Sequence, residues 1–337
     1  MATAFRSIQA GRESTIGTEV NADKIMLGTL TVSPTLTLHQ PVDERNSLAQ
    51  YYRTVPVAHQ STLRYTSDVT YEQVLDFLSM TLCAEATAAV DARTRYTFTP
   101  STTGNAQKGY TFEYGDNTEQ FTMAGVQCTS MEIGMNMGGA LSLSADMFGK
   151  FPVAKASATG LSNPTVKTAI TDSGKFYMDA NWGARGTTQK GDSAGEIILA
   201  GGSVRLNSGL APSRRLSSGS TDGVFNYTHV VESKRSHSMD LDILVTSDWE
   251  SDIWDAYRNQ TPKVVTLKFT AESNSIETGK SHEITVSMYG HFTSVGDIYS
   301  DSDGDSMVRV TLTSYDDGSG NEVEVIVDAK TSEVGTL

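Results

Sequence analysis

Alternating apolar and polar positions run through most of this chain, and each such run predicts a β-strand with one buried face. In residues 30–38 the even positions are apolar: Leu30, Val32, Leu36 and Leu38. Pro34 lies in this run and predicts an edge strand or a nearby bulge, because proline has no N–H to donate to a ladder. Further strands are predicted at residues 61–66, 95–99, 110–114, 119–124, 126–135, 140–148, 175–179, 196–199, 203–206, 229–244, 264–270, 283–289, 292–299, 307–315 and 322–327.

Two short helices are predicted among these strands. The first begins with a capping box, in which the Thr70 hydroxyl accepts from a backbone N–H and the Gln73 side chain reaches back. Its apolar stripe is Val74, Leu75, Phe77, Leu78 and Leu82, and the alanine-rich residues 83–92 predict a helical extension. The second helix has Ser247 and Glu250 as its capping box. Its apolar face is Trp249, Ile253, Trp254 and Tyr257.

The strand-then-helix order occurs in both halves, which indicates one structural unit used twice. Five landmarks recur in the same order at offsets of 164 to 177 residues. They are Gly17-Thr18 with Gly186-Thr187, Thr70 with Ser247, Gly125 with Gly290, Thr129-Ser130 with Thr293-Ser294, and Leu141-x-Leu143 with Val308-x-Val310. Loop insertions change such offsets by a few residues, so the sequence predicts a mainly β chain with two tandem duplicated domains.

The chain divides into five predicted segments. Residues 1–30 are polar and are expected to form an N-terminal arm with little structure of its own. Residues 31–150 form the first domain, 151–174 a linker rich in small residues, 175–328 the second domain, and 329–337 a C-terminal tail. Residues 41–57 and 211–227 are predicted loops of unusual length, and such loops often contact a partner.

The charge balance bears on possible partners. The 337 residues include 40 acidic and 26 basic side chains, for a formal net charge of −14. This excess argues against adhesion to nucleic acid, which needs Lys and Arg to displace counterions from phosphate. It suits DNA that passes without binding, and equally an acidic surface kept for solubility. No aromatic residues interleave with the basic pairs Arg214-Arg215 and Lys234-Arg235, as an RNA-binding surface requires.

Several features concern location and core. No apolar run approaches the ~18 residues of a membrane-spanning helix, and we expect no membrane anchor and no signal peptide. Cys83 and Cys128 are too few for a disulfide framework, so two buried free thiols are expected. Five methionines are expected to fill irregular gaps in the core: Met123, Met131, Met135, Met137 and Met147.

Candidate chemistry is sparse. Asp301, Asp303 and Asp305 alternate like the start of a calcium loop, but the sixth and twelfth positions hold Ser306 and Leu312 instead of Gly and Glu. A polar hairpin turn is the preferred interpretation. The histidines lack a zinc-binding spacing: His39, His59, His229, His237, His282 and His291. His237, Asp240 and Asp242 alternate on one predicted strand. We therefore expect no catalytic, cofactor-binding or metal-binding residues.

In their order, these features resemble the tail tube (major tail) proteins of long-tailed bacteriophages, in the two-domain form. The opening residues Arg12-Glu13-Ser14-Thr15-Ile16-Gly17-Thr18 resemble that family's polar arm ahead of the first strand. Leu30-Thr31-Val32-x-Pro34, followed by Asp43-Glu44-Arg45-Asn46-Ser47-Leu48, resembles its first strand and long loop. The strand-then-helix unit and the aspartate-glycine hairpins that close each half complete the resemblance.

The resemblance implies a fold and a function. Each domain is expected to be a β-sandwich or split barrel flanked by one short helix, similar to the type VI secretion tube protein. Three chains would close a homotrimeric ring with pseudo-sixfold symmetry, and stacked rings would form a tube without catalytic activity. The acidic lumen would hold the tape-measure protein and conduct DNA during ejection. Tail terminator and tail-tip proteins are further implied partners, with synthesis in the host cytoplasm and a final location in the virion tail.

Two other classes of function remain open at this point. A tandem β-sandwich module that binds a glycan or receptor needs exposed aromatic clusters. Trp249 and Trp254 are expected on a buried helix face, which leaves only Trp182. A metal-dependent hydrolase would use His229, His237 and the nearby aspartates.

Overall fold

The computed structural model describes residues 6–42, 53–83, 85–90, 93–116, 118–156, 160–193, 195–214, 226–227, 229–271, 275–297, 301–302 and 305–330. Strands dominate this part of the chain and its helices are short, which confirms the prediction of a mainly β protein. In the described residues, we find no helix with the length and apolar character needed to span a bilayer.

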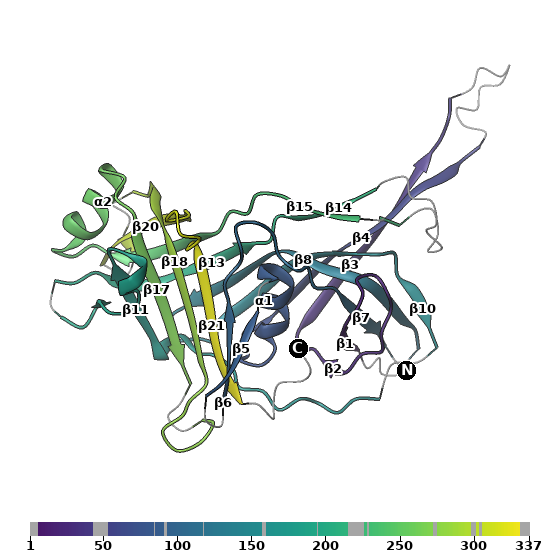
Figure 1. Ribbon diagram of the computed structural model, residues 1–337, viewed down its shortest axis with the longest axis horizontal. Helices are drawn as coiled ribbons and strands as arrows, with labels where there is room; N and C mark the ends of the chain where they lie inside the picture. Colours follow the sequence, from purple (N-terminus) through teal and green to yellow (C-terminus); the bar gives the residue numbers. More distant parts are fainter. Residues whose placement is uncertain are drawn as a thin grey trace.

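The strands form three sheets that are joined through two long strands (Figure 1). The first sheet has the order β2-β1-β7-β8-β10. Its strands are β1 (Ser7–Arg12), β2 (Lys24–Ile25), β7 (Tyr110–Gly115), β8 (Gln120–Asn136) and β10 (Val153–Lys155). Only the first half of β8 lies in this sheet, because its second half pairs with other strands.

The central sheet has eight antiparallel strands in the order β3-β4-β9-β8-β13-β16-β20-β18. The added strands are β3 (Thr29–His39), β4 (Val55–Asp68), β9 (Ser142–Gly149), β13 (Ile198–Asn207), β16 (Ser238–Leu244), β18 (Glu283–Val295) and β20 (Asp305–Ser314). β13 and β16 form a hairpin, and the segment that connects them contains two more strands. These are β14 (Leu210–Ser213) and β15 (His229–Glu232), which pair with each other and extend the hairpin.

The third sheet has the order β12-β11-β17-β18-β21-β6-β5. Its remaining strands are β5 (Ala86–Val90), β6 (Arg93–Phe98), β11 (Gly174–Asp179), β12 (Gln189–Lys190), β17 (Lys263–Thr270) and β21 (Val323–Lys330). A short β19 (Asp301–Ser302) pairs with the start of β20. The helices are α1 (Val74–Leu82) and α2 (Asp255–Arg258), with the short turns η1 (Thr171–Ser173), η2 (Trp182–Ala184) and η3 (Glu250–Trp254).

Seven strand pairings of the first half occur again in the second half, in the same order along the chain. β1 pairs with β2 and β7 as β11 pairs with β12 and β17. β8 pairs with β7, β9 and β10 as β18 pairs with β17, β20 and β21. β4 pairs with β3 and β9 as β16 pairs with β13 and β20. A short helix follows β4 and β16 alike.

A shared irregularity marks the same point in both halves. A bulge interrupts β8 at Thr129 and β18 at Thr293. The Thr129 hydroxyl donates to the backbone oxygen of Asp146 at 2.8 Å, and the Thr293 hydroxyl donates to that of Thr311 at 3.3 Å. The two threonines therefore occupy the same position within the two sets of strand pairings. Three other predicted matches are off by one or two residues. According to the strand pairings, Thr70 corresponds to Thr246, Val126 to Gly290 and Leu143 to Val308.

Most predicted strands are present, but several neighbours are fused. The runs at 119–124 and 126–135 form the single strand β8, because Gly125 adopts a φ of 69° and bends the strand without ending it. The runs at 196–199 and 203–206 form β13 with a bulge, and those at 283–289 and 292–299 are joined in β18. Part of the loop predicted at 211–227 is the strand β14.

The first 30 residues are more structured than predicted, since they contain β1 and β2. The buried Glu13 fixes the turn after β1, where its carboxylate accepts from the Gly17 N–H at 2.6 Å and from the Gly125 N–H at 2.7 Å. Burial raises the pKa of Glu13, although these hydrogen bonds and that from Thr111 act in the opposite direction. The polar sequence of this segment therefore reflects internal hydrogen bonds that periodicity does not reveal.

Helix α1 is enclosed on all sides, and every residue from Val74 to Leu82 is buried. The Thr70 hydroxyl accepts from the Gln73 N–H at 3.3 Å, as predicted. The Gln73 side chain does not complete the capping box: its Oε1 accepts from the Leu27 N–H and its Nε2 donates to the Ile25 oxygen. The helix start is thus tied to the segment around β2.

The predicted helical extension at 83–92 is wrong. Cys83 ends α1 in a left-handed conformation with a φ of 59°, and its N–H donates to the Ser79 oxygen. Residues Ala86–Val90 form β5, which makes a hairpin with β6. Pairing across this hairpin overrides the helix propensity of alanine.

The second helical segment differs from its prediction in two ways. The Ser247 hydroxyl donates to the Gly195 oxygen at 3.3 Å instead of capping the helix. Trp249 and Ile253 are buried as expected, whereas Trp254 is 38% exposed. The π-helical turn η3 changes the angular spacing of side chains, which turns Trp254 away from the core.

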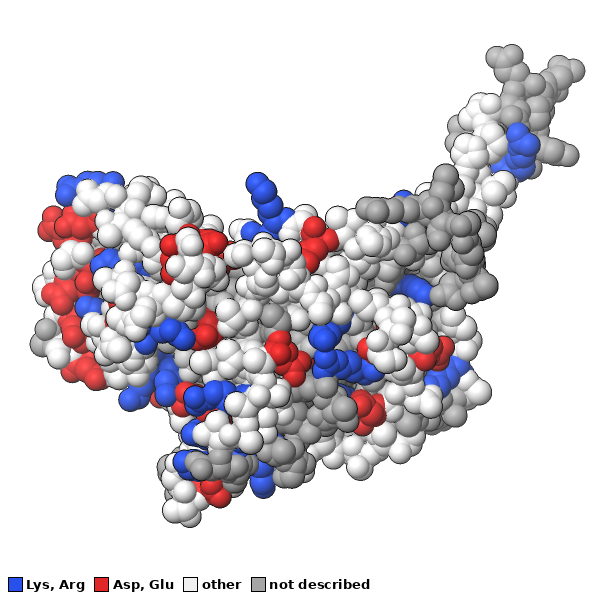
Figure 2. Space-filling view, viewed as in Figure 1, with Lys and Arg blue, Asp and Glu red and all other residues white. Residues whose placement is uncertain are grey.

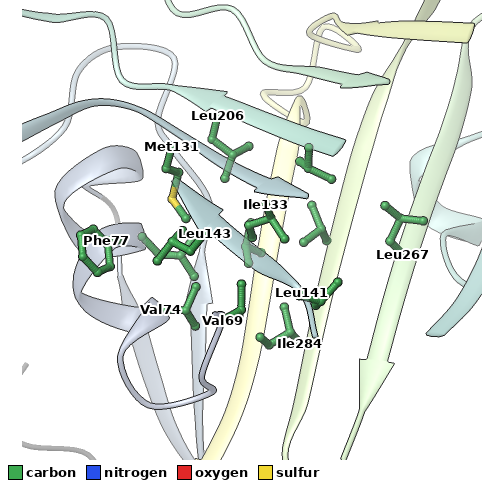
Figure 3. Close-up of a cluster of buried hydrophobic side chains, with 14 of the residues drawn as sticks. Val69, Val74, Phe77, Met131, Ile133, Leu141, Leu143, Leu206, Leu267 and Ile284 are labelled. Carbon is green, nitrogen blue, oxygen red and sulfur yellow. The ribbon is translucent and has the colours of Figure 1, made fainter. Parts of the chain in front are cut away.

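One apolar core extends through both halves (Figure 3). Val74 and Phe77 of α1 contribute to the same cluster as Ile133 of β8. Leu267 and Ile284 continue this cluster into the third sheet. The segment predicted as a linker adds to the connection, because the Ala169 N–H donates to the Val69 oxygen and the Ala169 oxygen accepts from the Leu141 N–H.

A buried ion cluster also joins the halves, at the pairing of β6 with β21. Asp328 is 1% exposed and accepts from Arg93 at 2.9 Å and from both arms of the Arg95 fork at 2.8 Å. Because Asp328 is the shared partner, its removal would leave two guanidinium groups without this carboxylate.

We predict that Asp328→Ala lowers the free energy of unfolding by about 2 kcal/mol. This is less than the loss of about 3–5 kcal/mol expected for a fully buried pair, because Arg95 is partly solvated. Urea unfolding of the purified variant measures this. Asp255→Ala is the matched control, because its Arg258 pair is exposed and contributes little. Equal effects of the two substitutions would contradict the assigned role of Asp328.

Candidate assembly surface

The central sheet has one face in the core and one face in solvent, and we call the solvent-facing side the polar face. Alternation along β4 and β16 places apolar residues inward and polar residues outward. Cross-strand register brings mostly Ser, Thr and Gly together on this side: Thr29, Thr31, Thr62, Thr66, Ser130, Gly134, Ser142, Ser144, Gly201, Ser203, Ser238, Thr311 and Thr313. These short side chains give the sheet a low-relief polar wall.

Charged residues on the polar face are mainly acidic. Among the described residues they are Asp68, Glu132, Asp146, Asp240 and Asp242 against Arg64, Arg205 and Arg309. Arg205 donates to Glu132 at 2.8 Å, and Arg309 donates with two nitrogens to Asp242 at 2.7 and 2.8 Å. The hydrogen bond from Arg205 lowers the pKa of Glu132. Two of the three arginines are therefore held by carboxylates on the same face.

The polar face ends in two open strand edges. β3 pairs with β4 on one side, and the second half of β18 pairs with β20 on one side; the described residues place no strand on the other side of either. Pro34 lies in β3, which confirms the prediction that proline marks an edge strand. An open edge presents N–H and C=O groups that can pair with another chain.

Within the chain, two other edges are joined: that of β8, the counterpart of β18, and that of β13, the counterpart of β3. β8 pairs with β13 over seven residues, from Gly201 opposite Asn136 to Asn207 opposite Ser130. The ion pair between Arg205 and Glu132 lies across this junction. The junction makes the two four-stranded halves one continuous eight-stranded sheet.

The hairpin of β3 and β4 extends beyond the body (Figure 1). We call this projecting part of the hairpin, and not residues 1–30, the arm from here on. Here the expectation that the apolar face is buried is wrong for Leu36 and Leu38, which are 45% and 44% exposed because the strands have left the core. Val55 and Val57 on β4 are exposed as well. Figure 2 shows few charged side chains on the described part of this arm. Most of the long loop at its tip lies outside the described residues.

The residues considered for chemistry do not form a site. No group of three or more His, Cys, Asp or Glu residues with metal-binding geometry occurs among the described residues. His229 is exposed at the start of β15, whereas His237 is fully buried. Asp240 and Asp242 lie on the polar face, where Asp240 accepts from the Thr311 hydroxyl at 2.7 Å.

The remaining expectations have mixed outcomes. Asp301 and Ser302 pair with Ser306 and Asp305, which confirms the hairpin turn; Asp303 lies outside the described residues. Cys83 and Cys128 are free and buried as predicted, and burial raises their thiol pKa values to about 11 and about 12. Four of the five methionines lie in the core, but Met137 is 48% exposed.

The basic pairs, where described, contact the protein itself. Arg214 donates to the His59 oxygen at 2.9 Å, and Arg235 lies 3.5 Å from Glu232. Arg215 lies outside the described residues.

No protein-family model matches the chain, and no curated protein has significant similarity to it.

His237 has a structural role at the junction of β13 and β16. Its Nδ1 accepts from the Asn207 N–H at 3.2 Å. Burial lowers the pKa of His237 to about 4, and the Arg235 charge acts in the same direction. The Glu322 carboxylate lies 4.0 Å from Nε2, beyond hydrogen-bond distance. The ring is therefore neutral in the folded protein at neutral pH.

We predict a pH-dependent contribution from His237 to stability. Its folded pKa is below the unfolded value of about 6.5, so this contribution is complete above pH ~6.5 and is lost as the pH falls toward 4, by about 3 kcal/mol at most. Urea unfolding at pH 7 and pH 4.5 measures the difference. His237→Gln is expected to flatten it, with His39→Gln on the arm as control. An unchanged pH dependence in His237→Gln would refute the assignment.

Proposed function

We propose that this protein is a structural subunit of a bacteriophage tail tube, which forms rings of three chains that stack around a polar, acidic lumen. The single observation that carries this proposal is the central sheet, with its mainly polar solvent face and its two open edges. The proposal extends to two tandem β-sandwich domains, each with one short flanking helix.

The repeated strand pairings support a duplicated origin. Seven pairings and the bulge threonines Thr129 and Thr293 recur in order, together with a short helix after β4 and after β16. A chain with two equivalent units has pseudo-twofold repetition, so three copies would give a ring with pseudo-sixfold symmetry.

Ring closure follows from the open edges. The joined halves leave one edge of each kind unpaired, β3 at one end and β18 at the other. Such a head-to-tail contact closes into a ring only if the rotation per subunit divides a full turn. Three chains would bring about 24 strands together, more than the 16–18 strands that leave an aqueous channel in porins.

The polar face has the properties that a DNA conduit requires. Ser, Thr and Gly give a smooth, hydrated surface, and the acidic excess repels phosphate. Arg205 and Arg309 are already bound to Glu132 and Asp242, so their charges are neutralised in place. A tape-measure protein could occupy the same lumen before DNA enters, with tail terminator and tail-tip proteins at the tube ends.

The decisive experiment is negative-stain electron microscopy of the purified protein. The proposal predicts rings or hollow tubes that form without any added ligand. A population that remains monomeric at high protein concentration, across ionic strengths, would refute it.

The exposed apolar face of the arm is proposed to contact the next ring in the stack. We predict that the double variant Leu36→Asp with Leu38→Asp forms rings but shortens tubes at least tenfold, because stacking would bury two unpaired carboxylates. The matched control is Thr37→Asp with His39→Asp, which lies on the other face of the same strand. Tube length in micrographs is the measurement, and full-length tubes from the Leu36/Leu38 variant would contradict a stacking role.

One observation favours a second candidate, a binding module for glycan or receptor. Trp254 is exposed, and its ring centroid lies 5.9 Å from that of Tyr257. Exposed aromatic pairs are typical of surfaces that stack on sugars. Intrinsic fluorescence during titration with a sugar array tests this alternative; saturable quenching that Trp254→Ala abolishes would support it, and an unchanged signal would exclude it.

A further inference from the structure

We propose that β18 of one chain pairs with β3 of a second copy in one defined register, which places Ser294 opposite Thr35 and Gly296 opposite Ser33. This inference rests on the proposed ring and specifies its subunit contact. The template is the junction of β8 with β13, which the same chain makes internally.

The register follows from equivalent positions in the two halves. The bulges equate Thr129 with Thr293, so Ser130 and Glu132 of β8 correspond to Ser294 and Gly296 of β18. Pairing through β4 and β16 equates Asn207 and Arg205 of β13 with Thr35 and Ser33 of β3. Ser130 lies opposite Asn207, and Glu132 lies opposite Arg205. The same relation therefore sets Ser294 against Thr35 and Gly296 against Ser33.

Backbone directions are compatible with this register on the β18 side. The Gly296 N–H donates to the Arg309 oxygen of β20, so Gly296 uses its main chain within its own molecule. Val295 and Asp297 alternate with it and direct their main-chain groups to the open edge. Among the described residues, Val295 has a strand partner only on the β20 side.

Backbone directions on the β3 side follow from β13. The Ser208 N–H donates to the Thr129 oxygen of β8, whereas the Asn207 N–H donates to His237 on the opposite side. Even positions of β13 therefore face β8. Their counterparts Leu30, Val32 and Pro34 face the open edge of β3. Val32 would lie opposite Asp297, and Pro34 opposite Val295. In both pairs the main-chain groups that point to the open edge of one strand would meet those of the other.

The open edges are protected against premature pairing. Pro34 stands at the counterpart of Leu206 and removes one donor from the edge, while Asp297 stands at the counterpart of Ile133 and introduces a charge. Proline and inward-directed charge are known means of discouraging edge-to-edge association. The contact between chains is therefore weaker than the internal junction, which suits a subunit that folds before it assembles.

A groove beside the start of β3 marks the same contact. It has a volume of about 610 Å³ and is lined by Ile8, Ile25, Leu27 and Tyr114, among others. The corresponding groove of the second half is smaller, about 260 Å³, and it is lined in part by Met137 of the first half and Thr171 of the connecting segment. In the second half, residues from the adjoining part of the chain thus line part of this groove. The larger groove of the first half therefore lies where a neighbouring chain would occupy the same position.

Disulfide cross-linking tests the register directly. Ser294 and Thr35 would form a non-hydrogen-bonded pair with Cα atoms about 4.5 Å apart, within the range that a disulfide spans. The double variant Ser294→Cys with Thr35→Cys should give dimers and trimers on non-reducing gels after mild oxidation of assembled protein. The native thiols Cys83 and Cys128 are buried and leave a low background.

Two controls define the outcome. Ser294→Cys with Ser33→Cys keeps both side chains on the polar face but shifts the register by two residues, and should cross-link at least tenfold less. A mixture of the single variants Ser294→Cys and Thr35→Cys should give dimers only, which proves a contact between chains. Rings in the micrographs with no preferred Ser294–Thr35 cross-link would overturn this register and leave the ring intact. The lack of any ring would instead overturn the proposed function.

Discussion

The antiparallel pairing of β8 with β13 is the interaction on which the rest of this structure depends. Each half contributes four strands to the central sheet, and each would expose an unpaired edge if it stood alone. Main-chain N–H and C=O groups at an edge require partners, either from water or from another strand. The chain satisfies them at one boundary by joining its own halves. That solution leaves a corresponding pair of edges at the outer ends of the sheet.

The interior supports this arrangement from behind. Helix α1 is wholly buried between the sheets, and its carboxylate is paired: Asp76 lies 2.8 Å from the Lys24 ammonium and accepts from the Tyr110 hydroxyl at 3.1 Å. The hairpin of β5 and β6 covers the edge of β21 and is fixed there by Asp328. Among the described residues no such hairpin follows α2, because β17 comes directly after it. The two halves therefore differ at this point.

Much of the fold could be predicted from the sequence because strands with one buried face alternate strictly. Periodicity does not show where a strand bends and continues, so Gly125 was expected to end a strand that it bends. Nor does it show that a strand leaves the core, as β3 does at Leu36 and Leu38. The run 86–90 was expected to be helical because alanine favours helices, whereas a long-range partner, β21, stabilises the hairpin that holds it.

The polar face itself was not predicted, although its signal is visible in the sequence. Thr29, Thr31, Thr62 and Thr66 occupy the polar positions of β3 and β4, and similar small residues occupy those of later strands. Only the register shows that they form one continuous surface, because strands that are distant in sequence are adjacent in the sheet. The pairing order also shows that the chemistry-bearing residues, such as His237, are separate structural features.

The most direct test of the account is the mass of the isolated ring, measured by native mass spectrometry. The expected mass is that of three chains of 36.3 kDa each, since the same seven strand pairings occur in both halves of every chain. A ring of six chains, or a single chain as the only species, would contradict it.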